Sequence, residues 1–183
     1  MAVPTALTTE RLVLRRWSDA DLEPFAALNA DPAVMEFLPA PLSRAESDAF
    51  VERIEGTFDR EGHGLWAVEV AGSGRFVGYV GLWPATFEAP FTPAVEVGWR
   101  LAGASWGHGY APEAARAAVA DGFERLGLGE ILSFTAVANE RSRRVMEKIG
   151  MVRDDGGDFD HPSLPDGHRL RRHVLYRLPS PRG

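Results

Sequence analysis

The side chain with the clearest chemical potential in this sequence is Glu96, which sits in the apolar run Val95-Glu96-Val97-Gly98-Trp99. Strand alternation puts Val95, Val97 and Trp99 on one face and Glu96 on the other. A carboxylate flanked by such residues is partly desolvated, which raises its pKa toward the range of a base that works near neutral pH. The pattern predicts that Glu96 is a general base, and a solvent-facing strand residue is the alternative.

A glycine-containing turn follows at residues 106–111, Trp-Gly-His-Gly-Tyr-Ala, and opens a helical pattern. Glycines let the backbone approach a ligand closely, and the first amides of a helix lack internal partners at the positive end of the dipole. The turn therefore predicts an anion site suited to a pyrophosphate, although an ordinary turn before a helix fits the same residues. A dinucleotide fold fits poorly, because Tyr110 and Ala111 follow the Gly-x-Gly and no third glycine has the required spacing.

A third segment, 138–151, carries polar side chains at the start of another helical pattern. Asn139 suits a helix N-cap, and Ser142 suits a first-turn serine that bonds the backbone. The same segment contains Arg141, Arg143 and Arg144, which are most simply interpreted as solvated surface residues.

The elements that must position these residues are marked by periodicity and by caps. Ser18 with Asp21 and Ser43 with Glu46 have the spacing of capping boxes. A meander of three strands followed by strand–helix–strand–helix implies a mixed sheet with helices packed on it. The predicted strands are 12–14, 65–71, 76–83, 94–101, 131–137 and 174–178, and the predicted helices are 18–29, 43–59, 112–126 and 141–149.

Composition limits the possible classes of protein. A chain of 183 residues predicts one domain spanning 1–183, with a core of about 9–178. The net charge of −6 argues against nucleic acid and is weakly compatible with a cationic substrate in an acidic cleft. There is no cysteine, no apolar run of the ~18 residues that span a bilayer, and no signal-like start. We expect a cytoplasmic protein with no membrane segment.

Four motifs in order resemble the GNAT superfamily of acetyl-coenzyme A-dependent N-acetyltransferases, in the branch that acetylates the N-termini of ribosomal proteins. They are Glu10-Arg11-Leu12-Val13-Leu14-Arg15, Glu96-Val97-Gly98-Trp99, Trp106-Gly107-His108-Gly109-Tyr110-Ala111-Pro112-Glu113-Ala114, and the spaced residues Asn139, Ser142, Glu147, Lys148 and Gly150. The resemblance implies an α+β fold: a mixed, mostly antiparallel central sheet, a splayed parallel pair of strands, and helices on both faces.

The resemblance also implies roles for individual positions. Trp106, Gly109 and Ala111 fall on the pyrophosphate turn, with tryptophan replacing the usual glutamine or arginine. Leu101 falls where a strand presents backbone groups to the pantetheine arm, Asn139 can bond that arm, and Ser142 stands in for the acid that assists the leaving thiol. The residues expected to bind acetyl-coenzyme A are Trp99, Leu101, Trp106, Gly107, His108, Gly109, Tyr110, Ala111, Asn139 and Arg144, with Glu96 and Ser142 as catalytic residues.

The acceptor is expected to be a small-molecule amine or a protein N-terminus, bound by the variable connections 30–42, 87–93 and 154–167. No metal is expected, because the family needs none and the histidine spacing does not favour one. His161, His168 and His173 are expected around the acceptor pocket or at the surface. A homodimer is compatible with the branch, and a non-catalytic acyl-coenzyme A-binding module is the alternative function.

Overall fold

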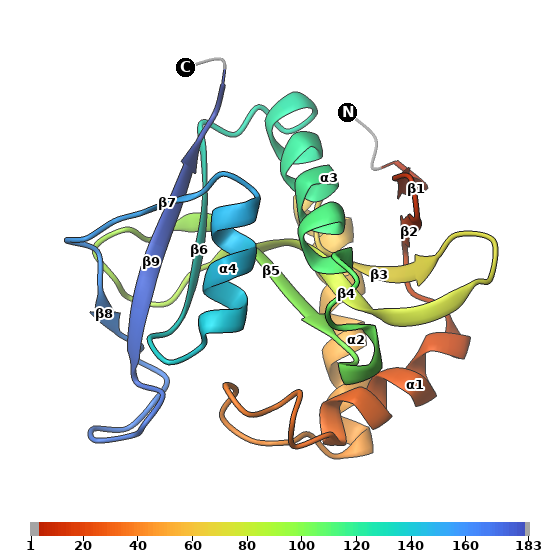
Figure 1. The fold of residues 1–183 in the computed structure, drawn as a ribbon, viewed down its shortest axis with the longest axis horizontal. Helices are drawn as coiled ribbons and strands as arrows, with labels where there is room; N and C mark the ends of the chain where they lie inside the picture. Colours follow the sequence, from red (N-terminus) through yellow and green to blue (C-terminus); the bar gives the residue numbers. More distant parts are fainter. Residues whose placement is uncertain (1–3, 182–183) are drawn as a thin grey trace.

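The computed structural model describes residues 4–181, and within them the backbone forms one nine-stranded sheet with helices on both faces. The strand order is β1-β2-β3-β4-β5-β6-β9-β7, and β8 pairs with β9 beside this path. Figure 1 shows the sheet running through the molecule. The strands are β1 (Ala6–Thr8), β2 (Leu12–Arg15), β3 (Leu65–Val70), β4 (Arg75–Ala85), β5 (Ala94–Leu101), β6 (Glu130–Ala136), β7 (Val152–Arg153), β8 (Phe159–Asp160) and β9 (Arg172–Pro179).

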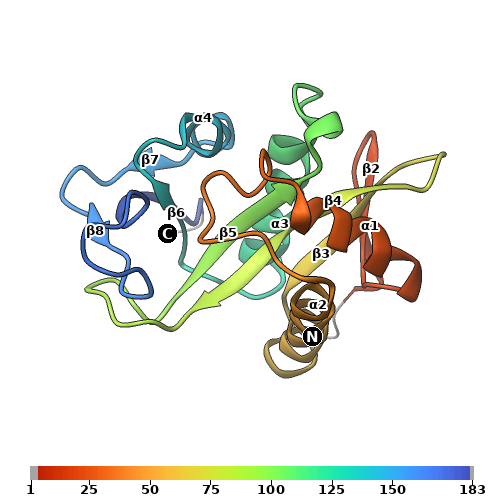
Figure 2. The same cartoon turned by 90° about the horizontal axis from the view of Figure 1, so that it is seen from below.

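The helices lie on opposite sides of the sheet, with α1 and α2 on one face and α3 and α4 on the other (Figure 2). Their bounds are α1 (Asp19–Ala30), α2 (Arg44–Glu61), α3 (Tyr110–Glu124) and α4 (Glu140–Lys148), with a 3₁₀ turn η1 (Gly103–Ser105). No helix within residues 4–181 is both long and apolar enough to span a bilayer. The boundaries predicted from the sequence agree with these elements to within two residues, and β1, η1, β7 and β8 were not predicted.

Local chemistry explains where the first two helices begin. The carboxylate of Asp21 accepts hydrogen bonds from the Ser18 backbone N–H and hydroxyl, both at 2.9 Å. Glu46 accepts the equivalent bonds from Ser43 at 2.7 Å, which confirms both predicted capping boxes. At its other end α2 stops at Gly62, whose φ of 72° is the left-handed conformation that glycine adopts at low cost.

The core lies between the sheet and the helices on each face. Phe25 of α1 and Phe58 of α2 are fully or almost fully buried on one side, and Ala115 of α3 is fully buried on the other. Apolar burial of this kind is the main stabilising term in a fold. It fixes β4 and β5 between the two helical layers, and these strands carry the functional groups described below.

The parallel pair β5–β6 separates as the strands run on. One pairing, Glu96 with Leu132, joins them, and the Ser133 hydroxyl donates a further bond of 2.9 Å to the Val97 carbonyl. No pairing of β5 with β6 is present past this point within the described residues. The opposite edge of β6 pairs along its whole length with β9. The mixed sheet with a splayed parallel pair is the fold class predicted from the sequence.

Candidate active site

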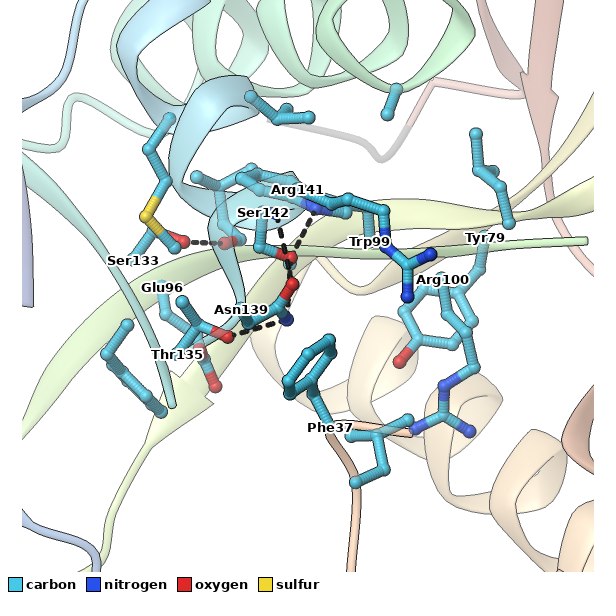
Figure 3. A pocket seen from close by; sticks show the side chains of 18 of the residues that line it. Phe37, Tyr79, Glu96, Trp99, Arg100, Ser133, Thr135, Asn139, Arg141 and Ser142 are labelled. Carbon is cyan, nitrogen blue, oxygen red and sulfur yellow. Dashed lines mark hydrogen bonds between the residues drawn. The ribbon is translucent and has the colours of Figure 1, made fainter. Parts of the chain in front are cut away.

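A cavity of about 680 Å³ opens where β5 and β6 separate. Its walls come from β4, β5 and β6, from the N-terminal ends of α3 and α4, and from the connection between α1 and α2 (Figure 3). Because the strands splay, side chains from both faces of β5 border the same space. Glu96, Gly98 and Arg100 approach it from the face of α1 and α2, and Val97, Trp99 and Leu101 from the face of α3 and α4.

Glu96 lies inside this cavity and is half-buried. Burial raises the pKa of its carboxyl to about 8. The direction of this pKa shift agrees with the sequence-based expectation, but the residues next to the carboxyl are not the Val95, Val97 and Trp99 that were expected. Its strand neighbours are Trp83 of β4 and Leu132 of β6, whereas Val97 and Trp99 lie on the opposite face of β5.

The turn before α3 has the geometry of an anion site. Gly107 and Gly109 have φ values of 78° and 79°, which bulky L-residues rarely adopt, and Gly109 is the N-cap of α3. Together with Ala111 they line the cavity. The helix begins at Tyr110, two residues earlier than predicted, so more free amides of its first turn are next to the glycines.

His108 and Tyr110 do not belong to the cavity lining, although both were predicted to bind the coenzyme. Their rings stack on each other with centroids 5.4 Å apart and planes inclined by 17°. The guanidinium of Arg11 lies 5.2 Å from the Tyr110 ring centroid. Since the left-handed glycines on either side turn the backbone sharply, these two side chains leave the turn on its outer side, and only their backbone amides remain candidates for phosphate binding.

Arg11 holds this turn through a network that sequence reasoning missed. Its Nε donates to Glu113 Oε2 at 2.7 Å, and its Nη1 donates to the His108 carbonyl at 2.9 Å. Glu113 also accepts from the Thr9 hydroxyl at 2.6 Å. The motifs Glu-Arg-Leu and Ala-x-Glu-Ala were noted separately, but a bond between residues 102 positions apart leaves no local signal.

Trp106 and Leu101 have structural roles beside the cavity that they line. The Trp106 indole N–H donates to the Leu101 carbonyl at 2.9 Å, so this carbonyl is already bonded within the protein. The guanidinium of Arg141 lies 4.2 Å from the Trp106 ring centroid and pairs with Glu36 at 2.7 Å. This stack ties the connection between α1 and α2 to the start of α4.

Asn139 and Ser142 meet Trp99 where β6 runs into α4. Asn139 is the N-cap of α4, as its sequence position indicated, because its side chain accepts from the Ser142 N–H at 3.2 Å. The amide of Asn139 also donates to Thr135 Oγ1 at 2.9 Å. Figure 3 shows these side chains together with Trp99, whose indole points to the Ser142 hydroxyl.

The cavity is not acidic, which corrects the expectation drawn from the net charge. Among the described residues that line it, Glu96 is the one carboxylate, and the cations are Arg100, Arg141, Arg144 and Lys148. Arg144 also pairs with Glu140 at 3.0 Å on the outer surface of α4. The other carboxylates of the described residues lie outside this lining, and Arg15 and Arg16, for example, each pair with two of them.

His161 and His173 line the cavity, and His168 does not. The two imidazole centroids are 5.1 Å apart, and burial lowers the pKa of each ring. Both rings contact Phe159 and Phe134. Within the described residues no group of three or more histidine, aspartate and glutamate side chains has the geometry of a metal site.

Two of the three connections expected to border the acceptor contribute residues to the lining of the cavity. Val34, Phe37 and Leu38 come from the connection between α1 and α2, and Ser163 from the segment before β9. The hairpin 87–93 does not belong to the lining; its phenylalanines pack on Phe134 and Phe159 behind the histidines. Tyr79 and Trp83 of β4, which sequence reasoning did not assign to the site, line the cavity.

A splayed strand pair, a helix N-terminus with free amides and a desolvated carboxylate therefore border one cavity. Comparison with known proteins shows the family of this chain. Residues 11–152 match the family described as Acetyltransferase (GNAT) domain, and the chain belongs to this family of acetyltransferases.

Relatives and solved structures support the same assignment. The chain is 35% identical over 158 residues to an Aspergillus fumigatus protein named FsC-acetyl coenzyme A-N(2)-transacetylase, covering 82% of this chain and 66% of the relative. A GNAT-family acetyltransferase from Bacillus anthracis superposes with a TM-score of 0.80 at 27% identity, covering 96% and 98% of the two chains. The fold also matches the ribosomal L7/L12 N-acetyltransferase RimL, solved with coenzyme A, with a TM-score of 0.75 over 98% of each chain at 16% identity.

Proposed function

We propose that the protein transfers an acetyl group from acetyl-coenzyme A to a primary amine, by direct attack within a complex of all three components. The observation that carries this proposal is the position of Glu96: a carboxyl with a pKa of about 8 lies in the same cavity as the glycine turn of α3. A base with this pKa is half ionised at about pH 8 and partly ionised at neutral pH, and its basicity suits removal of a proton from an ammonium group.

Acetyl-coenzyme A fits the residues present. The amides of Gly107 to Ala111 are candidates for binding the pyrophosphate, and Arg144 and Lys148, which also line the cavity, can meet further phosphate charge. The gap between β5 and β6 takes the pantetheine arm. The name of the Aspergillus fumigatus relative specifies acetyl coenzyme A as donor, and RimL was solved with coenzyme A; both support this donor.

The chemical step follows from this placement. Glu96, directly or through a water, takes a proton from the ammonium group, and the lone pair of the resulting neutral amine attacks the thioester carbonyl carbon. The oxyanion that forms accepts a hydrogen bond from a backbone N–H of the splayed part of β5. The carbonyl re-forms as the C–S bond breaks and the nitrogen releases its remaining extra proton to water, which yields the amide and a thiolate. A thiol pKa of roughly 8.5 lets the thiolate leave with modest help, for which Ser142 is the candidate donor.

The test is release of free thiol from acetyl-coenzyme A over a panel of amines. We expect turnover with the parent protein, and a kcat lower by ~10²–10⁴-fold for Glu96→Gln at neutral pH with coenzyme affinity retained. Glu52→Gln, which changes an exposed carboxylate on α2, is the matched control. Coenzyme binding without thiol release for any amine would favour a non-catalytic binding module.

A further inference from the structure

Three side-chain positions of β5, at Glu96, Gly98 and Arg100, form a stripe along the wall of the cavity that faces α1 and α2. We call this wall the acceptor face. All three line the cavity, and Glu96 and Arg100 are about 13 Å apart at Cα from the ordinary rise of a strand. A Cβ built on Gly98 would meet no atom within 4 Å. The stripe therefore has a carboxyl at one end, a guanidinium at the other, and open space between them.

Aromatic residues hold each end of this stripe. The strand register places Trp83 opposite Glu96 and Tyr79 opposite Arg100. The guanidinium carbon of Arg100 lies 5.4 Å from the Tyr79 ring centroid and 5.8 Å from that of Phe50. These contacts orient the guanidinium without neutralising its charge.

The charge of Arg100 is not compensated by the protein. Its Nη1 donates to Asn29 Oδ1, a neutral amide, at 2.6 Å, and the guanidinium also interacts with the hydroxyl of Tyr79. No carboxylate within residues 4–181 pairs with it, whereas Arg15, Arg16 and Arg125 all have acidic partners. The Arg100 Nε is buried and has no acceptor. A half-buried cation that lacks an anion is costly, so this position is suited to an anion supplied by a ligand.

No other group on this face supplies negative charge near Arg100. The further titratable groups of the lining, besides Glu96 and the cations, are Tyr79, whose pKa is raised by burial, and His161 and His173, whose pKa values are lowered by burial, so all three are neutral at pH 7. A dication such as a diamine would place its second charge toward Arg100 and the neutral histidines. The electrostatics of the acceptor face therefore disfavour polyamines, despite the net charge of −6.

We propose that the acceptor is an amine that also carries a carboxylate, with the amine at Glu96, the apolar frame over Gly98 and the carboxylate on Arg100. This inference rests on the proposed function and names its substrate class. An amine and a carboxylate separated by several bonds, such as a rigid aminomethyl-arene carboxylate, spans the stripe. A guanidinium binds a carboxylate through two parallel N–H bonds, which gives both affinity and orientation.

Three rigid amines of one shape test the charge at the far end: 4-(aminomethyl)benzoate, its carboxamide, and 1,4-bis(aminomethyl)benzene. Thiol release is measured for each with the parent protein. We expect kcat/KM for the carboxylate to exceed that for the carboxamide by about tenfold or more, and the diamine to be the poorest acceptor. Equal kcat/KM values for the carboxylate and the carboxamide, or a higher value for the diamine, would overturn this inference. The proposed acetylation of amines would still stand.

Variants of Arg100 connect the preference to this residue. In Arg100→Gln the preference for the carboxylate should fall to about twofold or less, and Arg100→Lys should retain part of it because the positive charge remains. Arg53→Gln is the control, since Arg53 also stacks on Phe50, at 5.2 Å, but is exposed on α2 outside the cavity. A carboxylate preference that survives unchanged in Arg100→Gln would assign it to another group.

A binding measurement separates this inference from the proposed function. 4-Methylbenzoate has no amine, and we expect it to bind the coenzyme complex about tenfold more tightly than 4-methylbenzamide does, by calorimetry, with the difference lost in Arg100→Gln. This result would support the anion site even if no amine were acetylated. Equal affinity of the acid and the amide would overturn the anion site even in a protein that acetylates amines. Coenzyme affinity, measured on each variant, reports that it is folded.

Discussion

Trp99 Nε1 donates a hydrogen bond of 3.3 Å to Ser142 Oγ, which joins β5 to the first turn of α4 beside the opening between the strands. Asn139 Nδ2 donates to the same oxygen at 3.1 Å. A hydroxyl oxygen has two acceptor sites, and both are occupied by these donors. The Ser142 proton is therefore free to be donated to a third group, which is the condition for a residue that assists a leaving thiolate.

Ser142→Ala should lower kcat by about tenfold or less, because a thiolate needs only modest help to leave. Trp99→Phe keeps an aromatic ring but removes the indole donor, so the hydroxyl gains rotational freedom and the loss of kcat should be smaller. Steady-state kinetics with saturating acetyl-coenzyme A measure both. An unchanged kcat in Ser142→Ala would leave protonation of the thiolate to solvent.

The ionisation of Glu96 should be visible in the pH dependence of the reaction. Only the carboxylate form accepts a proton, and its pKa is about 8. The parent protein can use the ammonium form of the acceptor, whereas Glu96→Gln depends on amine that is already neutral. We therefore expect the ratio of kcat/KM for the parent protein to that for Glu96→Gln to be constant below about pH 8 and to fall above it. A ratio that stays constant from pH 6 to pH 9, values chosen to bracket that pKa, would remove Glu96 as the base.

The raised pKa of Glu96 should also make the stability of the protein depend on pH. The pKa of this carboxyl rises from 4.5 to about 8 on folding, so the folded protein binds a proton that the unfolded chain has released between these values. The free energy of unfolding therefore falls as pH increases from 4.5 to about 8 through this group. Glu96→Gln should flatten that decline, measured by urea denaturation across this range. An identical decline in the variant would show that the carboxyl is not desolvated in the folded state.

Gly109→Val should weaken coenzyme binding by roughly tenfold or more, on the order of 1.4 kcal/mol, because it alters the left-handed N-cap of α3. Gly72→Val is the matched control: Gly72 has the same φ of 79° in the hairpin between β3 and β4. Both variants should lose similar stability through backbone strain, but only Gly109→Val should lose coenzyme affinity in a calorimetric titration. Equal affinities in the two variants would contradict the placement of the pyrophosphate.

Gly98→Ala should raise the KM of the acceptor and leave coenzyme affinity unchanged, because the new methyl group enters the open space of the acceptor face. We expect a change of about tenfold for an acceptor with an aromatic frame. Gly129→Ala is the control, since a Cβ there also meets no atom within 4 Å and Gly129 does not line the cavity. An acceptor KM that changes equally in both variants would place the acceptor elsewhere.

Local patterns predicted the elements well and the relations between them poorly. The bounds of β5, Ala94–Leu101, are those expected from strand alternation, and Asn139 is the N-cap that its position indicated. The two-residue strands β7 and β8 form only because β9 offers them backbone partners, so their own residues carry no signal. The uncompensated charge of Arg100 depends on the register with β4 and on the distribution of carboxylates in space. The net charge of −6 did not predict the charge of the cavity for the same reason: it does not show where in space the carboxylates lie.

The bonds from Arg11 to Glu113 and His108 make coenzyme binding and the docking of the first strands thermodynamically linked. If the turn of α3 binds pyrophosphate only while the connection between β1 and β2 holds it, the bound coenzyme must stabilise β1 and β2 by the same free energy. Backbone amides of these strands, which lie at one edge of the sheet, would then exchange with solvent more slowly in the complex. The protection would appear in strands from which no residue was assigned to the coenzyme site.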